Sequence, residues 1–84
     1  MWAIRYEREA ERAIDGLDPQ VRRRVLLAIG SLARDPRSMP GVKAMRGGDT
    51  YRLRVGDWRV IYTLQDAVLL VVVVQIGHRR EVYR

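Results

Sequence analysis

Residues 51–84 read YRLRVGDWRVIYTLQDAVLLVVVVQIGHRREVYR, and this stretch carries the strongest fold signal of the chain. Gly56 followed by Asp57 favours a two-residue hairpin turn, because glycine accepts the positive φ that such turns require. A turn at this point aligns three apolar pairs on one face of the hairpin: Val55 with Trp58, Leu53 with Val60, and Tyr51 with Tyr62. The stretch therefore predicts a three-stranded antiparallel meander, with the aromatic residues on its core side.

The opposite face of the same hairpin carries arginines. Arg54 is expected directly across from Arg59, and Arg52 two positions along its strand, facing Ile61. Like charges opposite one another destabilise a sheet, and no acid on this face of the two strands offsets them. A solvated outer face is one interpretation. We favour an anion site, because the guanidinium group is a permanently charged planar fork that suits phosphate.

The third strand of the meander lies in the most apolar run, residues 67–76, AVLLVVVVQI. This run is far shorter than the roughly 20 residues that a membrane-spanning helix needs. We place a turn at Gln65 and Asp66, directly before it. Residues 68–74 are apolar at every position, which indicates a strand inside the sheet, next to an N-terminal strand.

The N-terminal half predicts one strand and two helices. Residues 2–6, WAIRY, alternate as a short strand does. Residues 10–17 repeat apolar side chains at helical spacing, with Gly16 as a stop. A second helix is expected from the N-cap Asp18, with Pro19 at its first position, to Asp35 and Pro36. Residues 36–49 hold two prolines and three glycines and are interpreted as a loop.

Together these elements predict an α+β fold in one domain, residues 1–84. An N-terminal strand is followed by an antiparallel helical hairpin and then by the meander, and the strands form a four-stranded sheet. The apolar stripes of the helices need a partner surface, and the core face of the meander supplies one.

Composition indicates a polyanionic partner. Sixteen basic and ten acidic residues leave a net charge of +6, although composition does not separate RNA from DNA, a membrane surface or an acidic protein. The absence of cysteine excludes disulfides and a thiolate nucleophile, and a single histidine argues against a metal site, so no cofactor or metal is expected. The N-terminus lacks the apolar core of a signal peptide, and we expect a cytoplasmic protein without a membrane partner.

Three features of the chain point to a known family: the order of the elements, VKAMRGG leading into YRLRVGDWRVIY, and the final GHRREVYR. In these features the chain resembles the RelE/ParE toxin superfamily of toxin–antitoxin modules, and in particular its RelE-like branch. The resemblance covers essentially the whole chain. It implies a ribosome-dependent endoribonuclease that cuts mRNA in the decoding site, where a 2′-hydroxyl attacks the adjacent phosphate. It also implies a cognate antitoxin as partner, and a toxin–antitoxin complex that binds operator DNA.

The same resemblance assigns roles to residues. Its catalytic positions fall on Arg52, Arg54, Arg59, Arg79 and Tyr83, and its RNA-binding positions on Arg52, Arg54, Arg80, Lys43 and Arg46. Tyr83 is the candidate base, since surrounding guanidiniums would lower the pKa of a phenol from about 10.

These residues do not identify the general acid, which protonates the departing oxygen. The best-known members have lysines on the strand pair, whereas arginine is a poor proton donor at neutral pH. His78 is the alternative, because a histidine ordinarily titrates near pH 6.5. His78 as a mere cap of the last strand, or as a base-stacking ring, is an equally weighted interpretation.

Other interpretations follow from the same sequence. Tyr83 would also fit a residue packed on the sheet, and the run Arg22, Arg23 and Arg24 a solvated helix face or a contact to ribosomal RNA. For the whole protein, the alternative is a ParE-like poison of DNA gyrase without nuclease activity. A third possibility is a toxin that has lost catalysis and acts with its antitoxin as a repressor.

Overall fold

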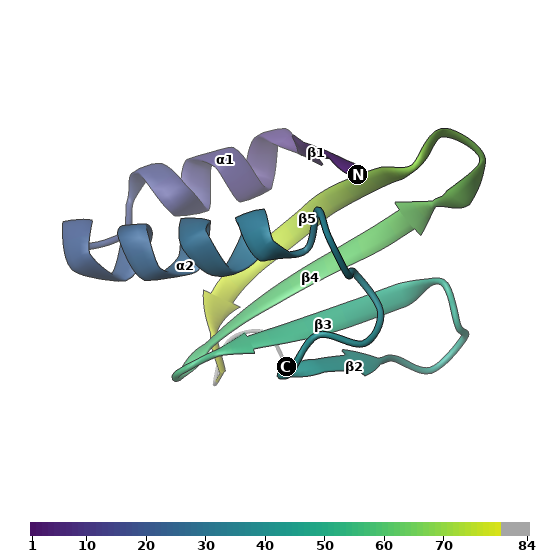
Figure 1. The fold of residues 1–84 in the computed structure, drawn as a ribbon. Coiled ribbons are helices and arrows are strands. Elements are labelled where there is room, and N and C mark those ends of the chain that lie inside the picture. Colours follow the sequence, from purple (N-terminus) through teal and green to yellow (C-terminus); the bar gives the residue numbers. More distant parts are fainter. Residues whose placement is uncertain (80–84) are drawn as a thin grey trace.

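The computed structural model describes residues 1–79 and confirms the predicted α+β fold (Figure 1). Five strands form one mixed sheet in the order β1-β5-β4-β3-β2, in which β1 is parallel to β5 and the other neighbours are antiparallel. The elements, in chain order, are β1 Ala3–Tyr6, α1 Arg8–Asp15, α2 Pro19–Ser31, β2 Val42–Ala44, β3 Thr50–Val55, β4 Trp58–Gln65, a short 3₁₀ helix Asp66–Val68, and β5 Leu70–His78.

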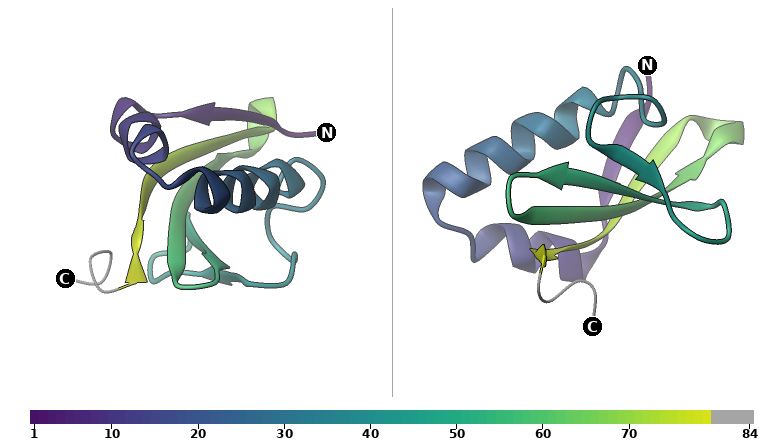
Figure 2. Two further views of the ribbon diagram at one scale, coloured as in Figure 1. Left: turned by 90° about the vertical axis from the view of Figure 1, so that its left-hand side faces the viewer. Right: turned by 90° about the horizontal axis from the view of Figure 1, so that it is seen from below.

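The core lies between the two helices and one face of the sheet. Both helices lie side by side, and the twisted sheet curls around α2 (Figures 1 and 2). Tyr62 and Leu53 are among its largest fully buried side chains, and Trp2, Tyr51 and Trp58 pack against it. The predicted register of the first hairpin is confirmed at every pair, and the expected assignment of these aromatic residues to the core is confirmed as well.

The helical hairpin forms as predicted, but α2 ends early. The Asp18 carboxylate caps α2 by accepting a hydrogen bond from the backbone N–H of Gln20. The expected end at Asp35 and Pro36 was wrong, because the helix stops at Ser31 and residues 32–34 tighten into successive i→i+3 hydrogen bonds. No helix within residues 1–79 has the length and apolar character needed to cross a membrane.

The segment 36–49 contains a strand, so the sheet has five strands rather than the predicted four. Strand β2 pairs with β3 and places Val42 opposite Leu53 on the core side. Gly41, with φ of +91°, bends the chain into this strand, and its carbonyl accepts the backbone N–H of Arg54 at 2.9 Å. The sequence did not predict this strand because it is only three residues long and has prolines and glycines nearby.

The second hairpin differs from the predicted turn at Gln65 and Asp66. Gln65 is the last residue of β4 and pairs with Leu70, and the connection is the four residues 66–69. The 3₁₀ turn is closed by Leu69, which has φ of +49°. A leucine in this left-handed region is uncommon. Strand β5 lies between β4 and β1, as predicted for a run that is apolar on both faces.

A β-bulge between β4 and β5 decides which side chains of β5 reach the core. Ile61 pairs with Gln75 while Tyr62 pairs with Val73, so Val74 is the extra residue. Because of this shift, both Val73 and Ile76 are core residues, although three positions separate them. The bulge therefore determines to which side of the sheet the last three residues of β5 point.

Candidate functional site

The face of the sheet opposite the core gathers four cations, Lys43, Arg52, Arg54 and Arg59, which we call the arginine face. Register places Arg54 directly opposite Arg59 and Lys43 directly opposite Arg52. Three adjacent strands thus contribute to one cationic surface, and β2 adds Lys43 to it. The structure brings these four predicted site residues together.

Arg59 is held against the β3–β4 turn. Its Nη1 atom donates hydrogen bonds to the carbonyl oxygens of Gly56, at 3.2 Å, and of Trp58, at 3.1 Å. The side chain is half-buried, and its strand position lies opposite Gly77, which adds no side chain to the face. A guanidinium fixed in this way is oriented before any ligand arrives.

Two buried apolar residues lie outside the core between the helices and the sheet. Ile61, opposite Arg52 on the neighbouring strand, is 6% exposed, and Val72 on β5 is 3% exposed. Neither belongs to the core between helices and sheet. Ile61 lies two positions from Arg59, and an anion beside such apolar surface is attracted more strongly than in open water, because the local dielectric is lower.

His78 does not lie on the arginine face. It pairs with Trp58, and its ring meets the Trp58 ring edge-on with a centroid separation of 5.6 Å. Trp58 packs against the core, so His78 lies at the end of the core side of the sheet. The bulge explains this placement, because regular alternation from Val73 would have put His78 on the other face.

The remaining predicted residues lie around this face or outside the described chain. Arg79 is exposed, and its backbone N–H donates to the carbonyl oxygen of Asp57 at 2.8 Å, which joins the end of β5 to the β3–β4 turn. Arg46 is exposed in the β2–β3 connection. Arg80 and Tyr83 lie outside the described residues.

Two other arginines hold the fold together. Arg22 caps the C-terminal end of α1 by donating to the carbonyl oxygens of Ile14, Asp15 and Leu17 at 3.0–3.1 Å. Arg37 donates to both carboxylate oxygens of Asp66 at 2.8 Å and to the Tyr51 hydroxyl at 3.0 Å, and these bonds raise the pKa of Arg37. Their charges are therefore engaged in structural contacts.

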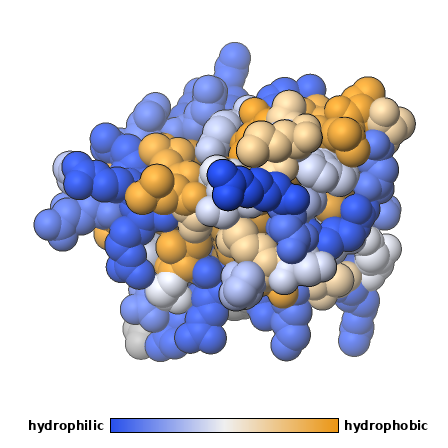
Figure 3. All heavy atoms as spheres, viewed as in Figure 1, coloured by the Kyte–Doolittle hydropathy of each residue, from blue (hydrophilic) through white to orange (hydrophobic). Residues whose placement is uncertain are grey.

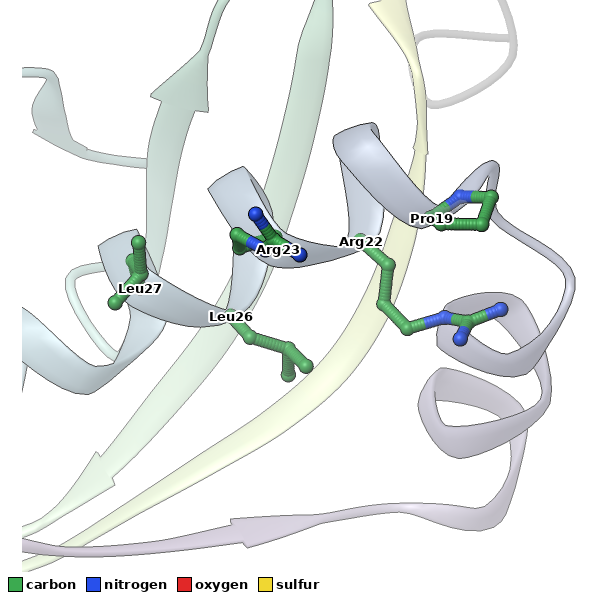
Figure 4. A pocket seen from close by; sticks show the side chains of 5 residues that line it. All are labelled: Pro19, Arg22, Arg23, Leu26 and Leu27. Atoms are coloured by element: carbon green, nitrogen blue, oxygen red, sulfur yellow. The ribbon is translucent and has the colours of Figure 1, made fainter.

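The run of residues 22–24 was interpreted as a solvated helix face or as a contact to ribosomal RNA, and the structure shows that its members do not share one environment. Arg23, together with Arg22, lines a shallow hollow of about 450 Å³ on α2, whose other lining residues are Pro19, Leu26 and Leu27 (Figure 4). Arg24 instead lies against the β3–β4 turn. No sequence signal distinguishes these neighbours, because the distinction depends on what α2 packs beside.

The hollow on α2 differs from the arginine face in the residues that line it. Its side chains come from one helix, and Leu26 and Leu27 are exposed apolar residues there. Figure 3 shows apolar side chains over this part of α2 and over the connection between β4 and β5. The arginine face suits an anion such as phosphate better than this hollow does, because it offers several guanidinium groups and Arg59 is held in a fixed orientation.

Residues 1–79 contain no cluster of three His, Cys, Asp or Glu side chains that would hold a metal ion.

Comparison with known proteins gives the chain a family. Residues 4–83 match the model of the ParE toxin of the type II toxin–antitoxin system parDE. Toxin RelG of Mycobacterium tuberculosis is 27% identical over 84 residues, which are 99% of this chain and 97% of that protein.

Solved structures show the same fold. The toxin–antitoxin complex RelBE2 of M. tuberculosis matches with a TM-score of 0.79 and 28% identity over 93% of this chain and 98% of that one. The archaeal RelE–RelB complex of Pyrococcus horikoshii matches with a TM-score of 0.82 and 25% identity, over 93% and 94%. The chain thus belongs to the ParE toxin family of type II toxin–antitoxin systems, and it is a RelE-like toxin.

Proposed function

We propose that this toxin is an endoribonuclease that cuts mRNA in the decoding site of the ribosome. The observation that carries the proposal is the arginine face, where Arg54 and Arg59 stand directly opposite each other and Arg59 is fixed to the β3–β4 turn. Such a surface is costly to a fold, and phosphate is the ligand that its geometry suits. Cationic contacts to the phosphate would stabilise the charge that grows on its oxygens during RNA cleavage.

The proposed reaction is an in-line transfer within the RNA. The 2′-hydroxyl oxygen attacks the adjacent phosphorus, the bond from phosphorus to the 5′-oxygen breaks, and a 2′,3′-cyclic phosphate forms. One proton leaves the 2′-hydroxyl and one is delivered to the departing 5′-oxygen. Arg59 contacts the scissile phosphate and stabilises the negative charge that grows on its oxygens, while Arg52 and Arg54 hold the backbone.

The proton carriers are assigned from the family resemblance. Tyr83 is the proposed base, and Arg79 a further contact to the phosphate. His78 remains the alternative to arginine as the acid, but its ring lies against Trp58 on the core side and not on the arginine face. A site without a full acid–base pair depends on the ribosome to align the mRNA, because alignment alone lowers the barrier substantially.

The proposed partners are the ribosome, mRNA and a cognate antitoxin, and the proposed location is the cytoplasm, where these meet. The related chains from M. tuberculosis and P. horikoshii are each in a toxin–antitoxin complex. We propose that the antitoxin covers the arginine face, and that the complex binds operator DNA.

The test is primer extension on a defined mRNA held in purified ribosomes, with the antitoxin-free protein added. We expect cuts confined to the decoding-site codon, none on free mRNA, and none with Arg59→Ala. Arg12→Ala is the matched control, because it removes an equal charge from the exposed side of α1. Antitoxin binding should survive both substitutions, and cuts of wild-type strength with Arg59→Ala would refute the assignment.

The second candidate is a ParE-like toxin that poisons DNA gyrase without cleaving RNA. It is favoured by the family model, whose description names ParE. A folded preparation that leaves ribosome-bound mRNA intact but blocks supercoiling by purified gyrase would establish it. The arginine face would then be a surface for DNA or for an acidic protein.

A further inference from the structure

The β3–β4 turn, Gly56 and Asp57, is approached by arginines from separate parts of the chain. Arg54 precedes it and Arg59 follows it, and Arg59 Nη1 donates to the Gly56 carbonyl oxygen at 3.2 Å. The end of β5 reaches the same turn through the bond from the Arg79 N–H to the Asp57 carbonyl oxygen. The turn is therefore an edge of the arginine face.

Arg24 reaches this edge from α2, on the helix side of the sheet. A Cβ atom built on Gly56 would lie 3.1 Å from Arg24 Nη2, so the Arg24 guanidinium rests against the space that the absent side chain leaves. Gly56 also has φ of +60°, which glycine adopts without strain. Gly56 thus allows the backbone conformation of the turn and leaves space for the Arg24 side chain.

Arg24 brings to this edge a positive charge that no residue within 1–79 pairs with. The Arg24 side chain is exposed, and within residues 1–79 it makes no ion pair and no hydrogen bond. No acid lies on α2, whose sequence is PQVRRRVLLAIGS, and Asp57 is the one acid of the turn itself. An anion from outside the chain would be attracted to the Arg24 guanidinium, because opposite charges at short range stabilise each other.

We propose that Arg24 and the β3–β4 turn form a second phosphate subsite, which binds the RNA backbone next to the phosphate contacted by Arg59. The inference rests on the proposed function, because the subsite extends the arginine face around the turn. Its ligand is a phosphodiester of single-stranded or ribosomal RNA. An acidic protein is the competing class, but continuity with Arg54 and Arg59 favours a strand that follows one cationic path.

The first measurement is binding to a single-stranded RNA oligonucleotide whose 2′-hydroxyls are methylated, so that binding is recorded without cleavage. Each phosphate contact in single-stranded RNA contributes about 0.7 to the slope of log affinity against log salt. We expect Arg24→Gln to lower that slope by about this amount, Arg24→Lys to restore most of it, and Arg23→Gln to leave it unchanged. Arg23 is the matched control, an adjacent exposed arginine that lines the hollow on α2.

The second measurement identifies the source of the phosphate. Affinity for ribosomes without mRNA is compared among the same variants, with urea midpoints recorded to show that each is folded. A loss with the oligonucleotide assigns the subsite to mRNA, and a loss confined to ribosomes assigns it to ribosomal RNA. Either supports the subsite.

Equal affinities and slopes for Arg24→Gln and wild type in both measurements would overturn the proposal, as would no RNA binding by the wild type. Weaker binding of Arg24→Gln to the antitoxin alone would also overturn it, and would make this edge a protein surface. Failure of the proposed function is seen separately, as absent cuts from a wild-type protein that still binds RNA.

Discussion

The two faces of the sheet use the same strands in opposite ways. On the core side, alternate residues of β3 and β4 are aromatic or aliphatic, and the rings of Tyr51 and Tyr62 stack with centroids 5.7 Å apart. On the arginine face, the intervening residues set Arg54 against Arg59. The first face gains free energy from burial and cross-strand contact, whereas the second loses some to repulsion.

The difference separates the residues that stabilise the fold from those that we propose bind RNA. A one-residue slip in register would exchange the two faces, so the core contacts also hold the arginines in place. Substitutions on the core side should therefore reduce the free energy of unfolding. Substitutions on the arginine face should change RNA binding while leaving the protein folded.

The largest effect is expected from Leu53→Ala on the core side. Leu53 is 1% exposed, and truncation leaves a cavity between β3 and the helices, so the free energy of unfolding should fall by about 3 kcal/mol. Urea denaturation followed by circular dichroism measures it. A loss below 1 kcal/mol would mean that the core side does not hold the sheet as described.

An intermediate effect is expected from Tyr62→Phe. The Tyr62 hydroxyl donates to the carbonyl oxygen of buried Pro36, and its loss should cost about 1–2 kcal/mol at neutral pH. Burial, and secondarily the neighbouring Tyr51 and Asp35, raise the pKa of Tyr62 in the folded protein. The folded state therefore holds this proton more tightly than the unfolded chain does.

That contribution to stability is complete below pH about 10, the ordinary pKa of tyrosine, and is lost as the pH rises from there through the raised value. Urea midpoints at pH 8, 10 and 11 should fall steeply for the wild type and less steeply for Tyr62→Phe. Parallel curves for the two proteins would assign the alkaline loss to other groups.

The smallest effect, and one of opposite sign, is expected from Arg54→Thr. Removing one of two opposed arginines should raise the free energy of unfolding by about 0.5 kcal/mol at low salt, while RNA binding weakens. The gain should shrink in 1 M salt, where exposed charges are screened. Destabilisation by this substitution would indicate that the arginine pair supports the fold.

The meander's first hairpin was predictable because one local signal, Gly56 before Asp57, fixes its register and thereby both faces. The bulge at Val74 was not, since residues 68–74 are apolar throughout and carry no alternation. For that reason the side of the sheet on which His78 lies could not be read from the sequence. The position of Arg24 beside Gly56 could not be predicted for another reason, because it depends on how α2 packs against the β3–β4 hairpin.

Strand β5 is the last described element to be synthesised, yet it lies between β1 and β4 in the sheet. Until it leaves the ribosome, β1 has no neighbour in the sheet and the core lacks Val71, Val73 and Ile76. Pairing the first strand with the last is a long-range step, which slows folding. The sheet and the core of a nascent copy therefore stay incomplete until β5 has been synthesised, although the local β3–β4 hairpin precedes it in the chain.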